Sequence, residues 1–94
     1  MTQTTVLAAA QTAAVSSDIV VPAFSQVSVS IFAAAGIPAG VRCSLLLKTP
    51  GKPELIAALT ALNPSTMITG PGTFVVTRPL ITSYGVNVGA FTEA

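Results

Sequence analysis

Strict alternation of apolar and polar residues marks the middle of the chain. Val27, Val29 and Ile31 occupy every second position, and the residues between them are Ser28 and Ser30. Because successive side chains of a β-strand point to opposite faces, this spacing predicts a strand with one buried and one solvated face. Helical spacing would carry both serines into the core.

A second stretch repeats the pattern and leads into a predicted hairpin. Its apolar positions are Val41, Cys43, Leu45 and Leu47, and the positions between and after them are Arg42, Ser44, Leu46 and Lys48. Residues 50–53 read Pro-Gly-Lys-Pro, the residue types of a tight turn. Residues 54–62 are good helix formers, but the tight turn before them favours a strand antiparallel to residues 41–48.

Short apolar runs separated by turn residues fill the rest of the chain. We expect further strands at residues 19–21, 66–69, 73–77, 80–84 and 86–91. Glycines at 85 and 89 flank residues 86–88, where they indicate either a bulge or the close approach of a neighbouring backbone. The sequence therefore predicts an all-β domain over residues 18–94, either a small antiparallel β-sandwich or a partly open barrel, and we favour the sandwich.

The first 17 residues have a different composition from the rest of the chain. They are rich in Thr, Ala and Gln, with one weak apolar cluster over residues 6–10. Alanine favours helix and threonine favours strand, so local preference leaves the conformation open. We expect residues 1–17 to form an extended N-terminal arm that docks on a neighbouring molecule.

The small number of ionisable groups argues against an enzyme. The chain has four basic and three acidic residues and no histidine, and the acids Asp18, Glu54 and Glu93 are spread along its length. Catalysis and metal or cofactor binding need such groups gathered in one pocket, so we expect no catalytic residue, metal site, cofactor or small-molecule substrate. Cys43, without a histidine to activate it, is expected in the core. A net charge of +1 makes nucleic acid an unsuitable partner.

The mean hydropathy of +0.78 raises the question of a membrane. The uncharged stretches at residues 19–41 and 55–77 both contain prolines, glycines and several polar residues, so neither is expected to span one. The N-terminus lacks the positive region of a signal peptide, and we expect synthesis in a cytoplasm. The excess of apolar residues then implies a protein partner that covers part of the surface.

Candidate interface residues come from three groups. Val6 and Leu7 form the apolar cluster of the expected arm. Arg42 and Arg78 either pair with acids of a neighbouring subunit or blunt a sheet edge, and the sequence leaves both open. The aromatic residues Phe24, Phe32, Tyr84 and Phe91 are placed either at an interface or under a second sheet.

One stretch of sequence carries a resemblance to a known class of proteins. Residues 70–79 read Gly-Pro-Gly-Thr-Phe-Val-Val-Thr-Arg-Pro; they follow Ala-Leu-Asn-Pro at 61–64 and precede Tyr-Gly-Val-Asn-Val at 84–88. Together with residues 20–23 and 28–32, this pattern resembles small virion structural proteins of tailed bacteriophages, best of all the head decoration, or cement, proteins.

The resemblance implies a non-enzymatic protein that binds the outside of a phage capsid and stabilises it. Its expected partners are the major capsid protein and its own copies, since many such proteins cluster as trimers, and its expected location is the virion surface. The likeness supplies no catalytic or ligand residue. A fibre, tail or baseplate subunit, or a module that recognises host glycans, remains the alternative.

Overall fold

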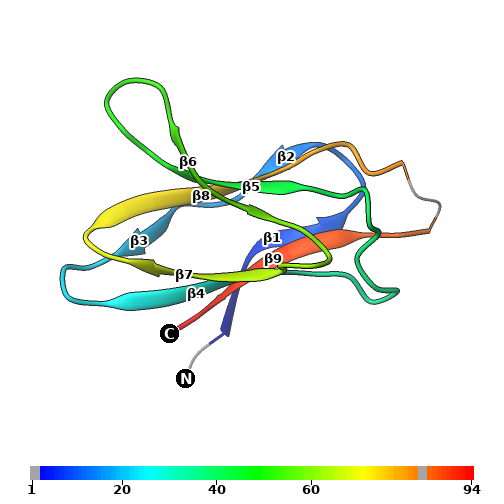
Figure 1. The fold of residues 1–94 in the computed structure, drawn as a ribbon, viewed down its shortest axis with the longest axis horizontal. Helices are drawn as coiled ribbons and strands as arrows, with labels where there is room; N and C mark the ends of the chain where they lie inside the picture. Colours follow the sequence, from blue (N-terminus) through cyan, green and yellow to red (C-terminus); the bar gives the residue numbers. More distant parts are fainter. Residues whose placement is uncertain (1–2, 83–84) are drawn as a thin grey trace.

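The computed structural model describes residues 3–82 and 85–94, and within these ranges the chain forms strands and no helix. The strands are β1 (Gln3–Ala10), β2 (Ala14–Val15), β3 (Ile19–Val21), β4 (Gln26–Phe32), β5 (Cys43–Leu47), β6 (Glu54–Leu59), β7 (Ser65–Thr69), β8 (Gly72–Arg78) and β9 (Val88–Glu93). They pack as two antiparallel sheets in two layers (Figure 1). The predicted all-β sandwich is confirmed.

The strand order has the nesting of a jelly roll. Sheet A has the order β1-β9-β4-β7, and sheet B has the order β2-β8-β5-β6, with β3 also paired to β8. If β2 and β3 count as one interrupted strand, the first strand pairs with the last, the second with the second last, and so on inward to the β5–β6 hairpin. This succession of antiparallel pairs, divided between two four-stranded layers, defines the double-sheet jelly roll.

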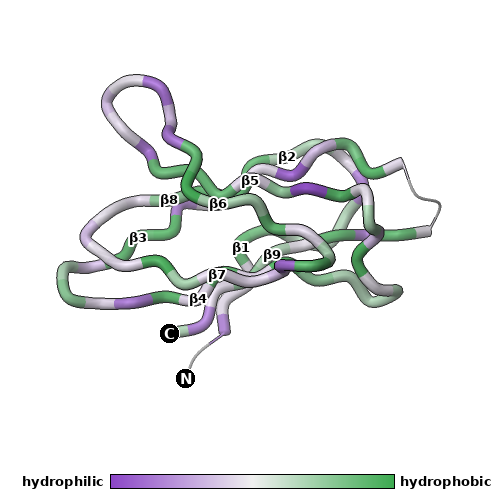
Figure 2. The backbone as a smooth tube through the Cα atoms, viewed as in Figure 1, coloured by the Kyte–Doolittle hydropathy of each residue, from purple (hydrophilic) through white to green (hydrophobic). Residues whose placement is uncertain are grey.

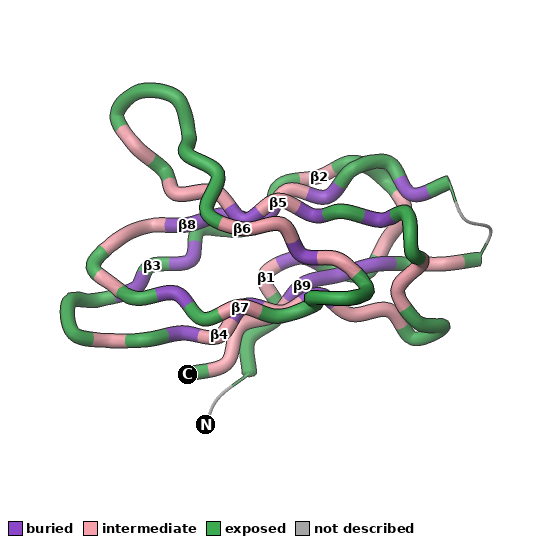
Figure 3. Tube along the Cα trace, viewed as in Figure 1, coloured by how far each residue is buried: buried purple, intermediate pink, exposed green. Residues whose placement is uncertain are grey.

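The core lies between the two sheets and is built by the predicted alternation. Val29 of β4 and Val88 of β9 come from sheet A, and Leu45 of β5 and Val76 of β8 come from sheet B; none of the four is exposed. Figure 3 shows buried segments recurring along both layers. The serines of β4 lie on the opposite face from its valines, as expected.

The described part of the segment expected as an N-terminal arm forms strands, and its docking on a neighbouring molecule stays a prediction. The described part of residues 1–17 is integrated into both sheets: β1 pairs with β9 in sheet A, and β2 pairs with β8 in sheet B. Leu7 is part of the common core. Residues of mixed local preference thus become strand because they find a backbone partner in β9 and an apolar layer beneath them.

The hairpin formed by β5 and β6 confirms the strand prediction for the helix-forming stretch. The register runs from Cys43 opposite Leu59 to Leu47 opposite Glu54. It shifts between Leu45 and Leu46, because Ile56 is an extra residue in β6. The loop that closes the hairpin projects from the sandwich and is largely hydrophilic (Figure 2).

Two expectations near the C-terminus fare differently. Residues 80–82 do not form the predicted strand, and residues 83–84 lie outside the described ranges. The strand predicted at residues 86–91 is present, shifted to Val88–Glu93. At Gly89 both alternatives for the glycine hold: β1 is bulged opposite this segment, and a Cβ atom there would lie 2.7 Å from the Leu7 carbonyl oxygen.

Candidate interaction surface

The outer face of sheet A is mostly polar, with Met67 and a pair of aromatic rings as its apolar side chains. Ser28 and Ser30 of β4 lie on the face turned away from sheet B. Ser65 and Thr69 of β7 and Thr5 of β1 lie on the same face. These short hydroxyl side chains hydrogen-bond water well. The face has the composition of a solvated sheet surface.

The outer face of sheet B carries a cluster of apolar residues, with Ser44, Thr73 and Thr77 among them. Val75 of β8 lies opposite Leu46 of β5, which lies opposite Leu55 of β6, so the three form a row across the sheet. Val15 and Val20 sit diagonally from Val75 on the other side of β8. Val20 is 69% exposed and Leu55 is 55% exposed. We call these five residues the apolar face of sheet B.

Uninterrupted apolar triplets in three adjacent strands produce this face. They are Ile19-Val20-Val21 in β3, Leu45-Leu46-Leu47 in β5 and Phe74-Val75-Val76 in β8. In such a run the first and third residues point to the core while the second points outward. Continuous apolar strands are typical of sheets covered on both faces. The sequence pattern predicted which residues face the core. It did not lead us to expect that the outward apolar residues gather on one face of the sandwich.

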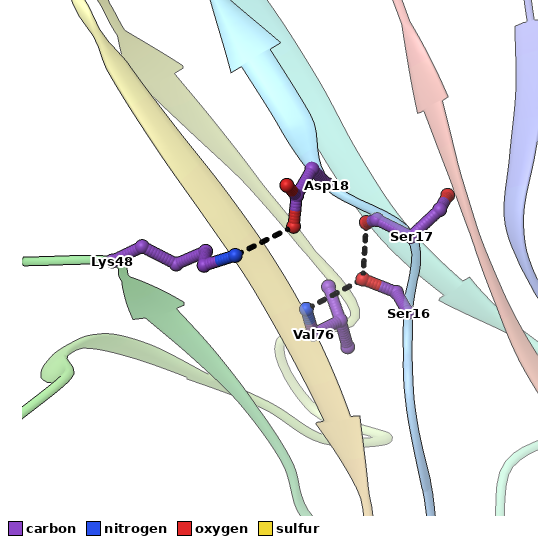
Figure 4. Close-up of polar contacts among 5 residues, drawn as sticks. All are labelled: Ser16, Ser17, Asp18, Lys48 and Val76. Atoms are coloured by element: carbon purple, nitrogen blue, oxygen red, sulfur yellow. Dashed lines mark hydrogen bonds and ion pairs between the residues drawn. The ribbon is translucent and has the colours of Figure 1, made fainter.

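An ion pair crosses the apolar face. The Nζ atom of Lys48, just after β5, lies 3.0 Å from the Oδ1 atom of Asp18, just before β3. Because β3 and β5 flank β8 on opposite sides, the bridge passes over β8 (Figure 4). Both side chains are about half exposed, so the pair adds little stability, but it fixes one charge of each sign within the face.

The interruption between β2 and β3 is closed by a serine. The backbone N–H of Ser16 donates to the carbonyl of Val76 at 2.8 Å, and the Oγ atom of Ser16 accepts from the N–H of Val76 at 2.9 Å (Figure 4). The hydroxyl therefore replaces a backbone acceptor at the break. Both backbone groups of Val76 in β8 are thereby hydrogen-bonded although the neighbouring strand is broken.

The predicted aromatic residues come together only in part. Phe32 of β4 and Phe91 of β9 have ring centroids 5.8 Å apart on the outer face of sheet A. With Gln3 and Thr5 they line a hollow of about 280 Å³. Phe32 also covers Gly89, where an added Cβ atom would lie 2.6 Å from its ring. The ring of Phe32 thus occupies the space that a side chain at position 89 would fill, which gives Phe32 a role in packing.

Phe24 stands apart from this pair. It lies in the turn between β3 and β4, is fully exposed and has a φ of 62°. A bulky residue rarely takes this left-handed conformation without compensation, so its position at a turn tip marks a candidate contact residue. Tyr84 lies outside the described residues.

Two of the interface candidates, Leu7 and Arg78, are buried in the chain's own fold. Leu7 packs in the core, and Val6 beside it is half-buried against the same cluster. Arg78 is 4% exposed. Arg42, by contrast, is exposed just before β5 and stays a candidate.

Arg78 joins the two sheets from within. Its Nε atom donates to the Thr12 carbonyl at 2.6 Å, and its Nη1 atom donates to the carbonyls of Ala8 and Val88, each at 2.7 Å. A residue at the end of β8 in sheet B thereby holds β1 and β9 of sheet A. Burial raises the pKa of the Cys43 thiol, and the positive charge of Arg78 opposes that shift. Cys43 is fully buried in the core, as expected.

The described residues contain no group of three or more His, Cys, Asp or Glu side chains placed to hold a metal ion. Among the same residues, no helix is long and apolar enough to cross a membrane. Comparison with protein-family models, curated proteins and solved structures finds no match. The apolar face of sheet B is consequently the most pronounced surface feature on which a function can be argued.

Proposed function

We propose that the protein is a non-enzymatic structural subunit that joins a larger protein assembly through the apolar face of sheet B. The observation that carries the proposal is the contrast in exposure within that face. Val75 is only 7% exposed although it lies outside the core cluster, whereas Val20 on the neighbouring strand and Leu55 two strands away are more than half exposed. Some apolar side chains of this face are thus already covered, and a partner surface would cover the exposed ones.

The free energy available from this face suits repeated contacts. Burying an exposed Val or Leu side chain completely contributes about 1.5–3 kcal/mol. Val15, Val20 and Leu55 are the most exposed members of the face. A single subunit would hold its partner modestly after the cost of association, and many copies on one particle would hold it firmly.

For the assembly itself we propose the outside of a tailed-phage capsid, where the protein would act as a decoration, or cement, protein. This step rests on the sequence resemblance over residues 20–32 and 61–88. The jelly-roll topology is compatible with it, since viral capsid domains commonly use this fold, although lectins and cupins use it too. The partners would be the major capsid protein and neighbouring copies of the chain, and the location would be the virion surface.

A matched pair of charge substitutions tests the proposal. Val20→Lys places an ammonium group on the apolar face of sheet B, and Ser30→Lys places the same group on the polar face of sheet A. Capsids purified without this protein, from the phage that carries its gene, would be incubated with each variant and pelleted. We expect Val20→Lys to bind at least ~10-fold more weakly, because the charge must be desolvated, and Ser30→Lys to bind like the wild type.

Each other outcome has a definite meaning. If neither substitution weakens binding, the apolar face does not mediate it. If the wild-type protein does not bind capsids but is found by electron microscopy on a fibre, tail or baseplate, the assembly proposal holds and the capsid location is wrong. Saturable binding to a glycan array that Val20→Lys leaves intact would favour host recognition instead.

A further inference from the structure

The free edge of β7 differs from the other edges of the sandwich. Strand β7 is the terminal strand of sheet A, and its register with β4 runs without a shift from Ser30 opposite Ser65 to Gln26 opposite Thr69. Its five residues include no charge and no proline. Regular, uncharged edges readily accept another strand, and natural proteins usually protect them.

The remaining edges are each protected. Strand β1 has two register shifts, and its Val6 carbonyl accepts a hydrogen bond from the N–H of Ser17. Strands β2 and β3 are separated by the break at Ser16. Strand β6 carries the bulge at Ile56. Only β7, among the edges of the described chain, keeps a regular backbone open along its whole length.

Two backbone hydrogen bonds establish which groups of β7 face outward. Ile31 donates to the Pro64 carbonyl at 2.9 Å, and Gly70 donates to the Ser25 carbonyl at 2.9 Å. In an antiparallel pair the residues that exchange hydrogen bonds alternate, so residues 64, 66, 68 and 70 face β4. The N–H and C=O groups of Ser65, Met67 and Thr69 therefore point to the free edge.

This set of outward groups is complementary to itself. A two-fold axis at Met67 places Met67 opposite the same residue of a second copy, and Ser65 opposite Thr69 in both directions. All three positions are then hydrogen-bonding pairs, which gives six bonds between the copies. Because β7 is uncharged, antiparallel pairing with itself brings no like charges together.

The side chains around the edge agree with a second copy. Met67 is 59% exposed and would meet its symmetry mate on the outer face of sheet A. Beside it a hollow of about 300 Å³ opens between the sheets, lined by Ile56, Met67 and Phe74 among others. A second copy at this edge would close the hollow and bury apolar surface in addition to the backbone contacts.

We propose that two copies of the chain associate through antiparallel pairing of their β7 strands about a two-fold axis at Met67, forming one continuous sheet of eight strands. This goes beyond the proposed function, because it uses a different surface and leaves the apolar face of sheet B free on both copies.

Two single-cysteine substitutions on the same edge test the register. In the proposed dimer the Cα atoms of the two residues 67 lie about 5.5 Å apart, within disulfide range. The two residues 69 are displaced by about 14 Å along the strands, too far for a disulfide. Met67→Cys should therefore form a disulfide-linked dimer under mild oxidation, and Thr69→Cys should stay reduced. The native Cys43 is fully buried and does not interfere.

Three results would overturn the proposal: no cross-linking of either variant, equal cross-linking of both, or preferential cross-linking at residue 69. A second measurement uses Met67→Lys, which puts two ammonium groups at the axis. Light scattering should give the wild type twice its 9.4 kDa chain mass and the variant the single mass, with an unchanged melting temperature. A wild type that stays monomeric at millimolar concentration also overturns the proposal, whereas capsid binding by Val20→Lys is decided independently.

Discussion

The two sheets present opposite solutions to the same problem, how to finish the outer face of a thin sandwich. In sheet A, Ser28 and Ser30 alternate with core valines, so water covers the face. In sheet B, Leu46 and Val75 stand at equivalent outward positions in the middle of β5 and β8, beside the polar pair Ser44 and Thr77. The difference teaches that the regular spacing of apolar residues along a strand indicates which side faces the core. The residue types at the outward positions indicate whether water or another protein covers the other side.

The contrast also separates stability from association. Hydroxyl side chains on sheet A are satisfied by water in the free molecule, so a partner gains little by covering them. Apolar side chains on sheet B gain free energy from being covered whether or not the sandwich is already stable. Substitutions on the two faces should therefore affect different measurements.

The largest effect is expected where the two sheets are tied together. Arg78→Met removes three hydrogen bonds, of which the one to the Val88 carbonyl is buried and those to Ala8 and Thr12 are partly buried. We expect a loss of about 3–5 kcal/mol in the free energy of unfolding, measured by urea denaturation. The matched control is Arg42→Met, an exposed site expected within about 0.5 kcal/mol of the wild type. Equal losses for the two variants would contradict the proposal that Arg78 stabilises the contact between the two sheets.

A smaller effect is expected on the outer face of sheet A. Gly89→Ala would place a Cβ atom 2.6 Å from the ring of Phe32 and 2.7 Å from the Leu7 carbonyl. Because the second contact is with backbone, we expect a loss of about 1–3 kcal/mol by the same assay. Gly40→Ala, where the added atom meets nothing within 4 Å, is the control. A stable Gly89→Ala protein would mean that Phe32 does not seal this face.

The ion pair across sheet B should matter less. Lys48→Gln leaves Asp18 half exposed, so solvent and salt screen the lost attraction. We expect about 0.2–1 kcal/mol of destabilisation at low salt, falling further as salt is added. A salt-independent loss would mean that packing by the lysine stem, rather than its charge, supports the face.

The smallest change in stability is expected for two substitutions that test the difference between the outer faces of the two sheets most directly. Val20→Thr keeps a β-branched side chain on sheet B, and Ser30→Val introduces one on sheet A. Each should change the free energy of unfolding by no more than about 0.5 kcal/mol. On a hydrophobic-interaction column we expect Val20→Thr to elute earlier than the wild type and Ser30→Val to elute later. Unchanged elution of both would remove the distinction between the faces.

The sequence predicted those strands that a local pattern of apolar and polar residues specifies. The alternation at residues 27–31 and 41–47 specifies β4 and β5, and the turn at residues 50–53 brings β6 back against β5. Their two-faced side-chain pattern and short loops leave few alternatives to an antiparallel sandwich. The order of strands, by contrast, depends on pairs far apart in the chain, which no local pattern reports.

The misses have a common physical cause. Strand β1 has weak propensity and is made a strand by β9, more than 70 residues later in the chain. Arg78 reads as an exposed strand cation until the carbonyls of Ala8 and Thr12 are brought to it. The apolar face of sheet B was visible in the sequence, because Leu46 interrupts an otherwise regular alternation between apolar and polar residues.

The nested pairing of the strands has a consequence for how the molecule is made. The hairpin of β5 and β6 joins neighbours in the chain, whereas β1 must wait for β9 before it has a partner. Folding should therefore proceed outward from the middle and finish only after β9 has left the ribosome, at the slow, millisecond-to-second rates of proteins dominated by distant contacts. Until then the newly made chain exposes a first strand that has no partner, and this intermediate is more prone to aggregation than the finished fold.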